Sequence, residues 1–136
     1  MRRAARVDAK SSEHDEQCAV VQWWASACNL YGLPPLALMA IPNANKLIRL
    51  ARNSYALAAY MRAEGLRPGA LDLFLAVPHD GLGGLWIENK VGDNKPSETQ
   101  QEMIGYLECG YEVRVCKGAD QAIQTIKNYL ARRRKQ

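Results

Sequence analysis

The stretch LDLFLAVPHDGLGGLWIENK, residues 71–90, contains the pattern that decides the fold. Its first part, residues 71–77, is mostly apolar and predicts a buried strand. Residues 78–84 are rich in glycine and predict a turn, and residues 85–90 predict an antiparallel partner strand. The sequence therefore predicts a β-hairpin near the middle of the chain.

Charged side chains lie at the open end of this hairpin. Residues two apart on a strand share a face, so Glu88 and Lys90 should point the same way. If the turn is centred near Gly81, Asp72 lies opposite Lys90 and diagonal to Glu88, at a distance of about 7–8 Å. The hairpin is therefore expected to bring two carboxylates and one ammonium group together.

Apolar periodicity and breaker residues predict further elements on both sides of the hairpin. Ser12 and Asp15 have the spacing of a capping box, which begins a first helix that is expected to run to about Leu30. The other predicted elements are a strand over residues 36–41, helices over about 44–64, 97–108 and 119–130, and a strand over 111–116. The fold class is α/β: a small mixed sheet flanked by helices.

The length of the chain, 136 residues, suits a single domain. We expect a basic arm over residues 1–10, one domain over residues 11–131 and a basic tail over residues 132–136. The formal net charge of +4 is compatible with a polyanionic partner but is not proof of one.

The cysteines and the apolar segments bear on where the protein works. None of the four cysteines forms a Cys-x-x-Cys pair, and the two histidines are not spaced as zinc ligands. Buried thiols in a reducing compartment are the preferred interpretation. With no secretory signal and no segment that could cross a bilayer, we expect an intracellular protein without a membrane partner.

The hairpin residues suit one kind of chemistry. Carboxylates such as Asp72 and Glu88 are hard oxygen ligands for Mg²⁺ or Mn²⁺, and the backbone carbonyl of Asn89 is a further candidate ligand. A bound ion would polarise a phosphodiester and activate water, while Lys90 would orient that water or offset negative charge. The alternative for these residues is a structural salt bridge on an edge strand.

Beyond the hairpin, the chain resembles the VRR-NUC family of virus-type replication and repair nucleases, a branch of the PD-(D/E)xK superfamily. The resemblance extends from about Glu13 to Leu130, and its one visible departure is Leu71-Asp72 where the family has Pro-Asp. The matching residues are Glu16-Gln17 followed by Val20, Val21 and Trp23, then Ile41-Pro42-Asn43, residues 64–72 and 85–90, Pro96-Ser97 with Gln100, and Gly110-Tyr111.

The resemblance implies a restriction-endonuclease-like core in which Asp72 and Glu88 bind metal and Lys90 is catalytic. It also implies that Glu16 and Gln100 belong to the site, with Glu16 as a further possible metal ligand. Glu16 lies on the apolar face of the first helix and is expected to point into the active site. The alternatives are a Glu16 that frays to solvent and a Gln100 that is simply exposed.

The expected partner is DNA. We expect the chain to act as a homodimer on four-way or other branched junctions, in a phage or mobile-element repair context. Lys46, Arg49 and Arg52 share one side of the second helix and would track the DNA backbone, unless they form an ordinary solvated face. A cluster around the end of the first helix and the breaker that follows it would supply the dimer contact, unless it completes the core of a monomer. Its members are Trp23, Trp24, Tyr31, Leu33 and Leu36.

The sequence thus predicts a metal-dependent DNA endonuclease, located in the cytoplasm of a bacterial host if a phage encodes it. The alternative is a catalytically weak nucleic-acid-binding module of the same fold. No phosphate-binding glycine loop, nucleophile triad or small-molecule cofactor motif is present. His79 and Asp80 receive no role, because a lone histidine in a turn is expected to be exposed.

Overall fold

The computed structural model describes residues 12–42, 47 and 55–133. Its first helix, α1 (Glu13–Ala27), begins with the predicted capping box, in which the Ser12 hydroxyl and the Asp15 carboxylate each bind the other residue's backbone N–H. A helix up to residue 30 was predicted, but the chain tightens after Ala27 into a 3-10 helix, Cys28–Tyr31. Local capping therefore fixes the start of α1 better than its end.

The sheet has four strands in the order β1-β2-β3-β4. Strands β1 (Leu38–Ala40), β2 (Leu73–Leu75) and β3 (Leu85–Lys90) pair antiparallel, whereas β3 and β4 (Glu112–Lys117) pair parallel. The mixed sheet is as predicted, but β1 and β2 are shorter than expected. Before β1 the chain follows a 3-10 helix, Pro35–Ala37, because proline at its first position favours that turn.

The register of the β2–β3 hairpin differs from the predicted one. Leu73 pairs with Ile87 and Phe74 with Trp86, so one step further along Asp72 lies opposite Glu88 and not opposite Lys90. A bridge between His79 and Leu82 closes the turn, leaving residues 76–78 on the β2 side and only 83–84 on the β3 side. This extra residue on one arm shifts the pairing, as a β-bulge does.

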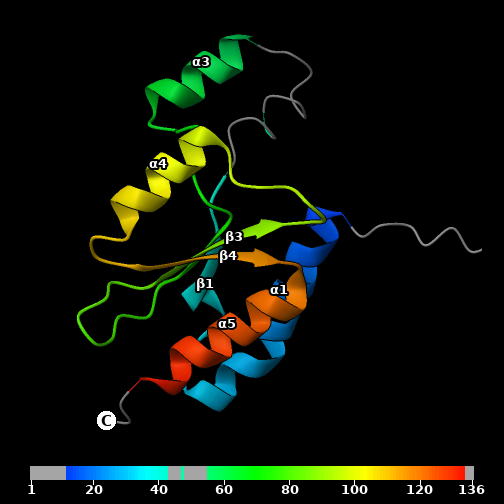
Figure 1. The fold of residues 1–136 in the computed structure, drawn as a ribbon, viewed down its shortest axis with the longest axis vertical. Coiled ribbons are helices and arrows are strands. Elements are labelled where there is room, and N and C mark those ends of the chain that lie inside the picture. Colours follow the sequence, from blue (N-terminus) through cyan, green and yellow to red (C-terminus); the bar gives the residue numbers. More distant parts are fainter. Residues whose placement is uncertain (1–11, 43–46, 48–54, 134–136) are drawn as a thin grey trace, which may run out of the picture.

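The helices form layers on the two faces of the sheet (Figure 1). Helices α1 and α5 (Ala119–Ala131) lie together and cover one face, while α4 (Glu98–Leu107) lies on the other. The main core lies under α1 and α5. It contains alternate residues of β2 and β3, namely Leu73, Leu75, Leu85 and Ile87, together with Val20, Trp24, Ala122, Ile126 and Tyr129.

Helix α3 (Tyr55–Ala63) is the described part of the predicted second helix, which ends at Glu64-Gly65 as expected. The rest of that prediction, including Lys46, Arg49 and Arg52, lies outside the described residues. Side chains of α3, α4 and β3 line a largely apolar cavity of about 510 Å³. No helix in the described ranges is both long and apolar enough to cross a bilayer.

The cluster of aromatic and apolar residues around the end of α1 is mostly part of the core. Trp24 is 2% exposed, stacks on Tyr31 and donates its indole N–H to the carbonyl of Pro35. Trp23, Tyr31 and Leu33 pack against the core, whereas Leu36 is exposed. Trp24 is therefore not available as a surface contact, which corrects part of the predicted dimer surface.

His79 is also buried, although it was expected to be exposed. Its imidazole is 6% exposed and lies 4.0 Å, centroid to centroid, from the ring of Tyr129 on α5. The Tyr129 hydroxyl donates to the carbonyl of Val77 at 2.7 Å. The β2–β3 turn is thus packed onto α5, which explains why the histidine is covered.

Candidate active site

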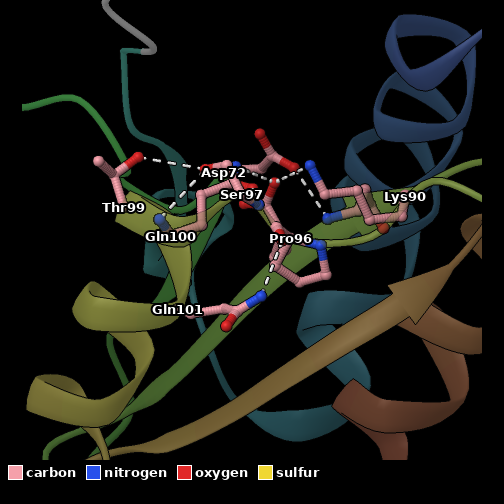
Figure 2. Close-up of polar contacts among 9 residues, drawn as sticks. Asp72, Lys90, Pro96, Ser97, Thr99, Gln100 and Gln101 are labelled. Carbon is pink, nitrogen blue, oxygen red and sulfur yellow. Dashed lines mark hydrogen bonds and ion pairs between the residues drawn. The ribbon is translucent and has the colours of Figure 1, made fainter.

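Glu88 is the centre of a polar cluster on the α4 face of the sheet. The residue is 1% exposed, although the hydrophobic core lies on the opposite face. Its Oε1 atom lies 3.0 Å from the Nζ atom of Lys90 and accepts a hydrogen bond of 2.6 Å from the Nε2 atom of Gln100. Figure 2 shows Lys90 and Gln100 on opposite sides of this cluster. Lys90 on strand β3 and Gln100 on helix α4 therefore bind the same carboxylate oxygen of Glu88.

Asp72 is fixed beside Glu88 by a backbone contact. The N–H of Asn89 donates to Asp72 Oδ2 at 2.8 Å, just before β2 begins. This contact holds the Asp72 carboxylate against the end of β3, where the register sets it opposite Glu88. The hairpin therefore places the two carboxylates side by side, as the sequence predicted, although through a different register.

The orientation of Gln100 follows from a second capping box. Ser97 caps α4, and its backbone N–H donates to Gln100 Oε1 at 2.9 Å. Because an N–H can only face the oxygen of the amide, the Gln100 Nε2 is left to donate to Glu88. Ser97 is thus a positioning residue that the sequence analysis did not assign, although its Ser-x-x-Gln spacing carries the signal.

The charge on Glu88 is costly in this setting. The pKa of Glu88 is raised from 4.5 to about 7, with burial as the main cause and the neighbouring Asp72 charge as the second, while Lys90 and Gln100 act in the opposite direction. The second oxygen, Oε2, is buried and has no hydrogen-bond partner within the described part of the chain. A buried carboxylate oxygen without a partner is suited to a proton or a cation.

The donor set fits a hard divalent cation. Asp72 and Glu88 offer carboxylate oxygens, and Glu88 Oε2 is the atom that still lacks a partner. Over residues 12–42, 47 and 55–133, no group of three or more His, Cys, Asp or Glu side chains gathers around one point. A cation here would therefore take its remaining ligands from backbone carbonyls and water, as Mg²⁺ commonly does.

Glu16 accepts a hydrogen bond outside the cluster of Asp72, Glu88, Lys90 and Gln100. Its Oε2 atom accepts a hydrogen bond of 2.7 Å from the backbone N–H of Ala119, at the start of α5. The described hydrogen bonds and ion pairs join Glu16 to α5 and not to Asp72 or Glu88. Within the described residues, the hydrogen bonds and ion pairs that join Glu88 to Lys90 and Gln100 do not involve Glu16.

Comparison with known proteins gives a match among solved structures. No family model and no curated protein matches the chain. A solved structure described as a VRR_NUC domain protein superposes with a TM-score of 0.72 over 90% of this chain and 90% of that chain, at 26% sequence identity. The structure confirms the resemblance to the VRR-NUC family. A VRR-NUC neighbour supports a role among nucleases and a PD-(D/E)xK fold.

The structure brings together Asp72, Glu88, Lys90 and Gln100, which the resemblance assigned to one site. It attaches Glu16 to the start of α5. The proposed DNA-binding residues Lys46, Arg49 and Arg52 lie outside the described residues, so their role stays a prediction.

Proposed function

We propose that the chain is a metal-dependent DNA endonuclease that hydrolyses phosphodiester bonds at the Asp72–Glu88–Lys90 cluster. The observation that supports this most strongly is the buried Glu88 carboxylate, which has one oxygen held by Lys90 and Gln100 and the other without a hydrogen-bond partner among the described residues. A plain salt bridge would not require a second, partly buried carboxylate, Asp72, directly opposite. The VRR-NUC neighbour supports the nuclease class.

In this proposal Mg²⁺ or Mn²⁺ is held by the carboxylates of Asp72 and Glu88 and by the backbone carbonyl of Asn89. When bound, such an ion polarises the scissile phosphate and lowers the pKa of a water molecule. The protein contributes the position of its donors. Asn89 fixes Asp72 through its N–H, and Gln100 fixes Glu88 through its amide.

Lys90 is the catalytic cation of the proposal. Its side chain is 12% exposed and its ammonium lies 3.0 Å from Glu88, so the ammonium can turn from the carboxylate towards a bound phosphate. A positive charge there offsets the negative charge that develops on the phosphate in the transition state. Lys90→Ala should therefore lower turnover more than DNA binding.

We further propose that the substrate is branched DNA, such as a four-way junction, and that the chain acts as a homodimer. A domain of this size with one site cuts one strand, and a two-fold pair cuts two strands with related geometry. The net charge of +4 favours a polyanion. Lys46, Arg49 and Arg52 are the proposed contacts to the DNA backbone.

The test is incubation with labelled duplex, flap, single-stranded and four-way-junction DNA, with and without Mg²⁺. We expect cleavage that requires the ion, prefers the junction and falls at least about a hundredfold in folded Asp72→Ala and Glu88→Ala proteins. Glu108→Ala is the control, because that exposed residue ends α4 away from Gln100. Junction binding without cleavage by the wild-type chain would instead support a nucleic-acid-binding module.

A further inference from the structure

Helix α5 lacks a cap of its own. Its N-cap residue is Gly118, which has a left-handed φ of 85° and no side chain to accept a hydrogen bond. The first backbone N–H groups of a helix have no partner within the helix and carry its positive dipole end. An acceptor for the start of α5 must therefore come from another part of the chain.

That acceptor is Glu16, which lies in the first turn of α1. Its Oε2 atom accepts from the Ala119 N–H at 2.7 Å, across a separation of 103 residues. Glu16 is partly buried, and a carboxylate is the side chain that a helix N-terminus favours. Glu16 thus supplies the cap that glycine cannot, and it ties α1 to the start of α5.

The capped segment also touches the strand that carries the active site. The Gly118 N–H donates to the carbonyl of Lys90 at 3.2 Å, and Lys117 pairs with Lys90 at the end of the parallel β3–β4 ladder. Gln121 of α5 accepts from the Lys117 N–H at 2.8 Å. The backbone of Lys90 is therefore held by a segment whose own position depends on Glu16.

We infer that Glu16 is a positioning residue: it caps α5 from α1 and thereby fixes the end of β3 from which Lys90 reaches Glu88. Glu16 touches no reacting atom in this role. A metal ligand at this position needs the negative charge, whereas a cap needs only an acceptor oxygen. Glu16→Gln keeps such an oxygen and removes the charge, so this single change separates the two roles.

The experiment compares Glu16→Gln and Glu16→Ala, with Gln22→Ala as a control because Gln22 is an exposed residue of the same helix. It rests on the proposed nuclease activity and measures turnover and KM for junction DNA, together with thermal stabilisation by Mg²⁺ alone. In Glu16→Ala we expect turnover to fall about tenfold, with KM and the Mg²⁺ midpoint unchanged. Glu16→Gln should stay within about threefold of wild type in turnover, in KM and in the Mg²⁺ midpoint.

Two results would overturn the inference. One is a Glu16→Gln protein that is as slow as Glu16→Ala. The other is a shift of about tenfold or more in the Mg²⁺ midpoint of Glu16→Gln, which is expected of a lost metal ligand or its immediate support.

Hydrogen exchange at the Ala119 amide is the second readout, and it does not depend on catalysis. The amide should lose protection in Glu16→Ala and keep most of it in Glu16→Gln. If Glu16→Ala fails to fold, the test compares protection of the Ala119 amide in Glu16→Gln and in wild type. Retained protection supports the cap, and lost protection contradicts it. A wild-type chain that cuts no DNA would contradict the proposed function, while the exchange data would still test the cap.

Discussion

At the scale of single residues, Glu88 has two oxygens in unlike surroundings. Oε1 forms an ion pair with Lys90 and accepts a hydrogen bond from Gln100. Oε2 is buried and has no hydrogen-bond partner within the described ranges. The carboxylate cannot rotate freely, because two donors from different elements hold the same atom. Its second oxygen is therefore presented in a fixed direction beside Asp72.

Gln100→Ala should lower DNA cleavage about 10- to 100-fold, because it removes the amide that orients Glu88. Gln101→Ala is a matched control, since Gln101 is the next residue on α4, is exposed and donates its side-chain amide to the carbonyl of Pro96. The comparison is made with initial rates at saturating Mg²⁺. Equal rates for the two variants would contradict a role for Gln100 in the site.

The pH dependence of stability follows from Glu88 as well. Its folded-state pKa, about 7, is above its ordinary value of 4.5. The group's contribution to stability is therefore fully present below pH 4.5 and is lost as the pH rises through 7. Without divalent ions, we expect this group to lower the free energy of unfolding between pH 5 and 8 by at most ~3 kcal/mol.

Urea unfolding in the presence of a chelator, at several pH values, measures this effect. The Glu88→Gln protein is the reference, because its amide does not titrate while every other group is retained. Wild type should lose stability relative to Glu88→Gln as the pH rises. Parallel stability curves for the two proteins would show that Glu88 is not perturbed.

These residues also show what the sequence could predict. Asp72, Glu88 and Lys90 were predictable because strand alternation and one hairpin bring them together, and Gln100 because the family pattern includes it. The partner of Glu16 was not predictable, since Ala119 lies 103 residues away and the contact depends on how α1 and α5 pack. The burial of His79 likewise depends on a ring of α5.

At the scale of elements, local signals fixed the helix starts and some strands. Capping boxes at Ser12 and Ser97 mark the starts of α1 and α4, and apolar periodicity marks α5. The register of β2 against β3 was predicted wrongly, because an extra residue in one arm of the loop cannot be seen from alternation. Element types were therefore more predictable than their pairing.

A close backbone approach joins the loop before Asp72 to the first turn of α4. A Cβ atom added at Gly69 would lie 2.6 Å from the carbonyl oxygen of Thr99 and 3.1 Å from the N atom of Gln100, and Gly69 has a φ of +84°. Gly69→Ala should therefore displace Gln100 from Glu88. We expect a loss of stability beyond the roughly 1–2 kcal/mol of a left-handed alanine, together with lower cleavage.

Gly65→Ala is the control for that variant. Gly65 also has a positive φ, +99°, but an added Cβ would meet nothing within 4 Å. Thermal unfolding and cleavage rates of the two variants separate backbone strain from the clash. Should Gly65→Ala be as slow as Gly69→Ala, the contact with α4 would not be what the site requires.

At the scale of the whole molecule, the proposed homodimer can be tested through the surface that follows α1. Leu36 is 75% exposed there, whereas Trp24 is 2% exposed. In sedimentation at micromolar concentration we expect a dimer for wild type and a monomer with an unchanged fold for Leu36→Glu, since a buried charge opposes association. Trp24→Ala should instead cost about 3–5 kcal/mol of folding stability.

A monomeric wild-type chain without preference for junction over duplex DNA would refute the dimer proposal. If the Leu36→Glu protein remained a dimer, the chain would still be a homodimer, but the contact between its subunits would lie on another surface. Circular dichroism of each variant shows whether the fold is intact.

The link between Glu16 and Ala119 also bears on the order in which the protein folds. The Asp72–Asn89 contact closes a separation of 17 residues, whereas the Glu16–Ala119 contact closes one of 103. Distant contacts form more slowly because a longer loop must be ordered first. In pulsed hydrogen exchange during refolding, the amide of Asn89 should become protected before that of Ala119. The carboxylates would then come together early, and the backbone of Lys90 would be fixed only when α1 and the start of α5 pack together.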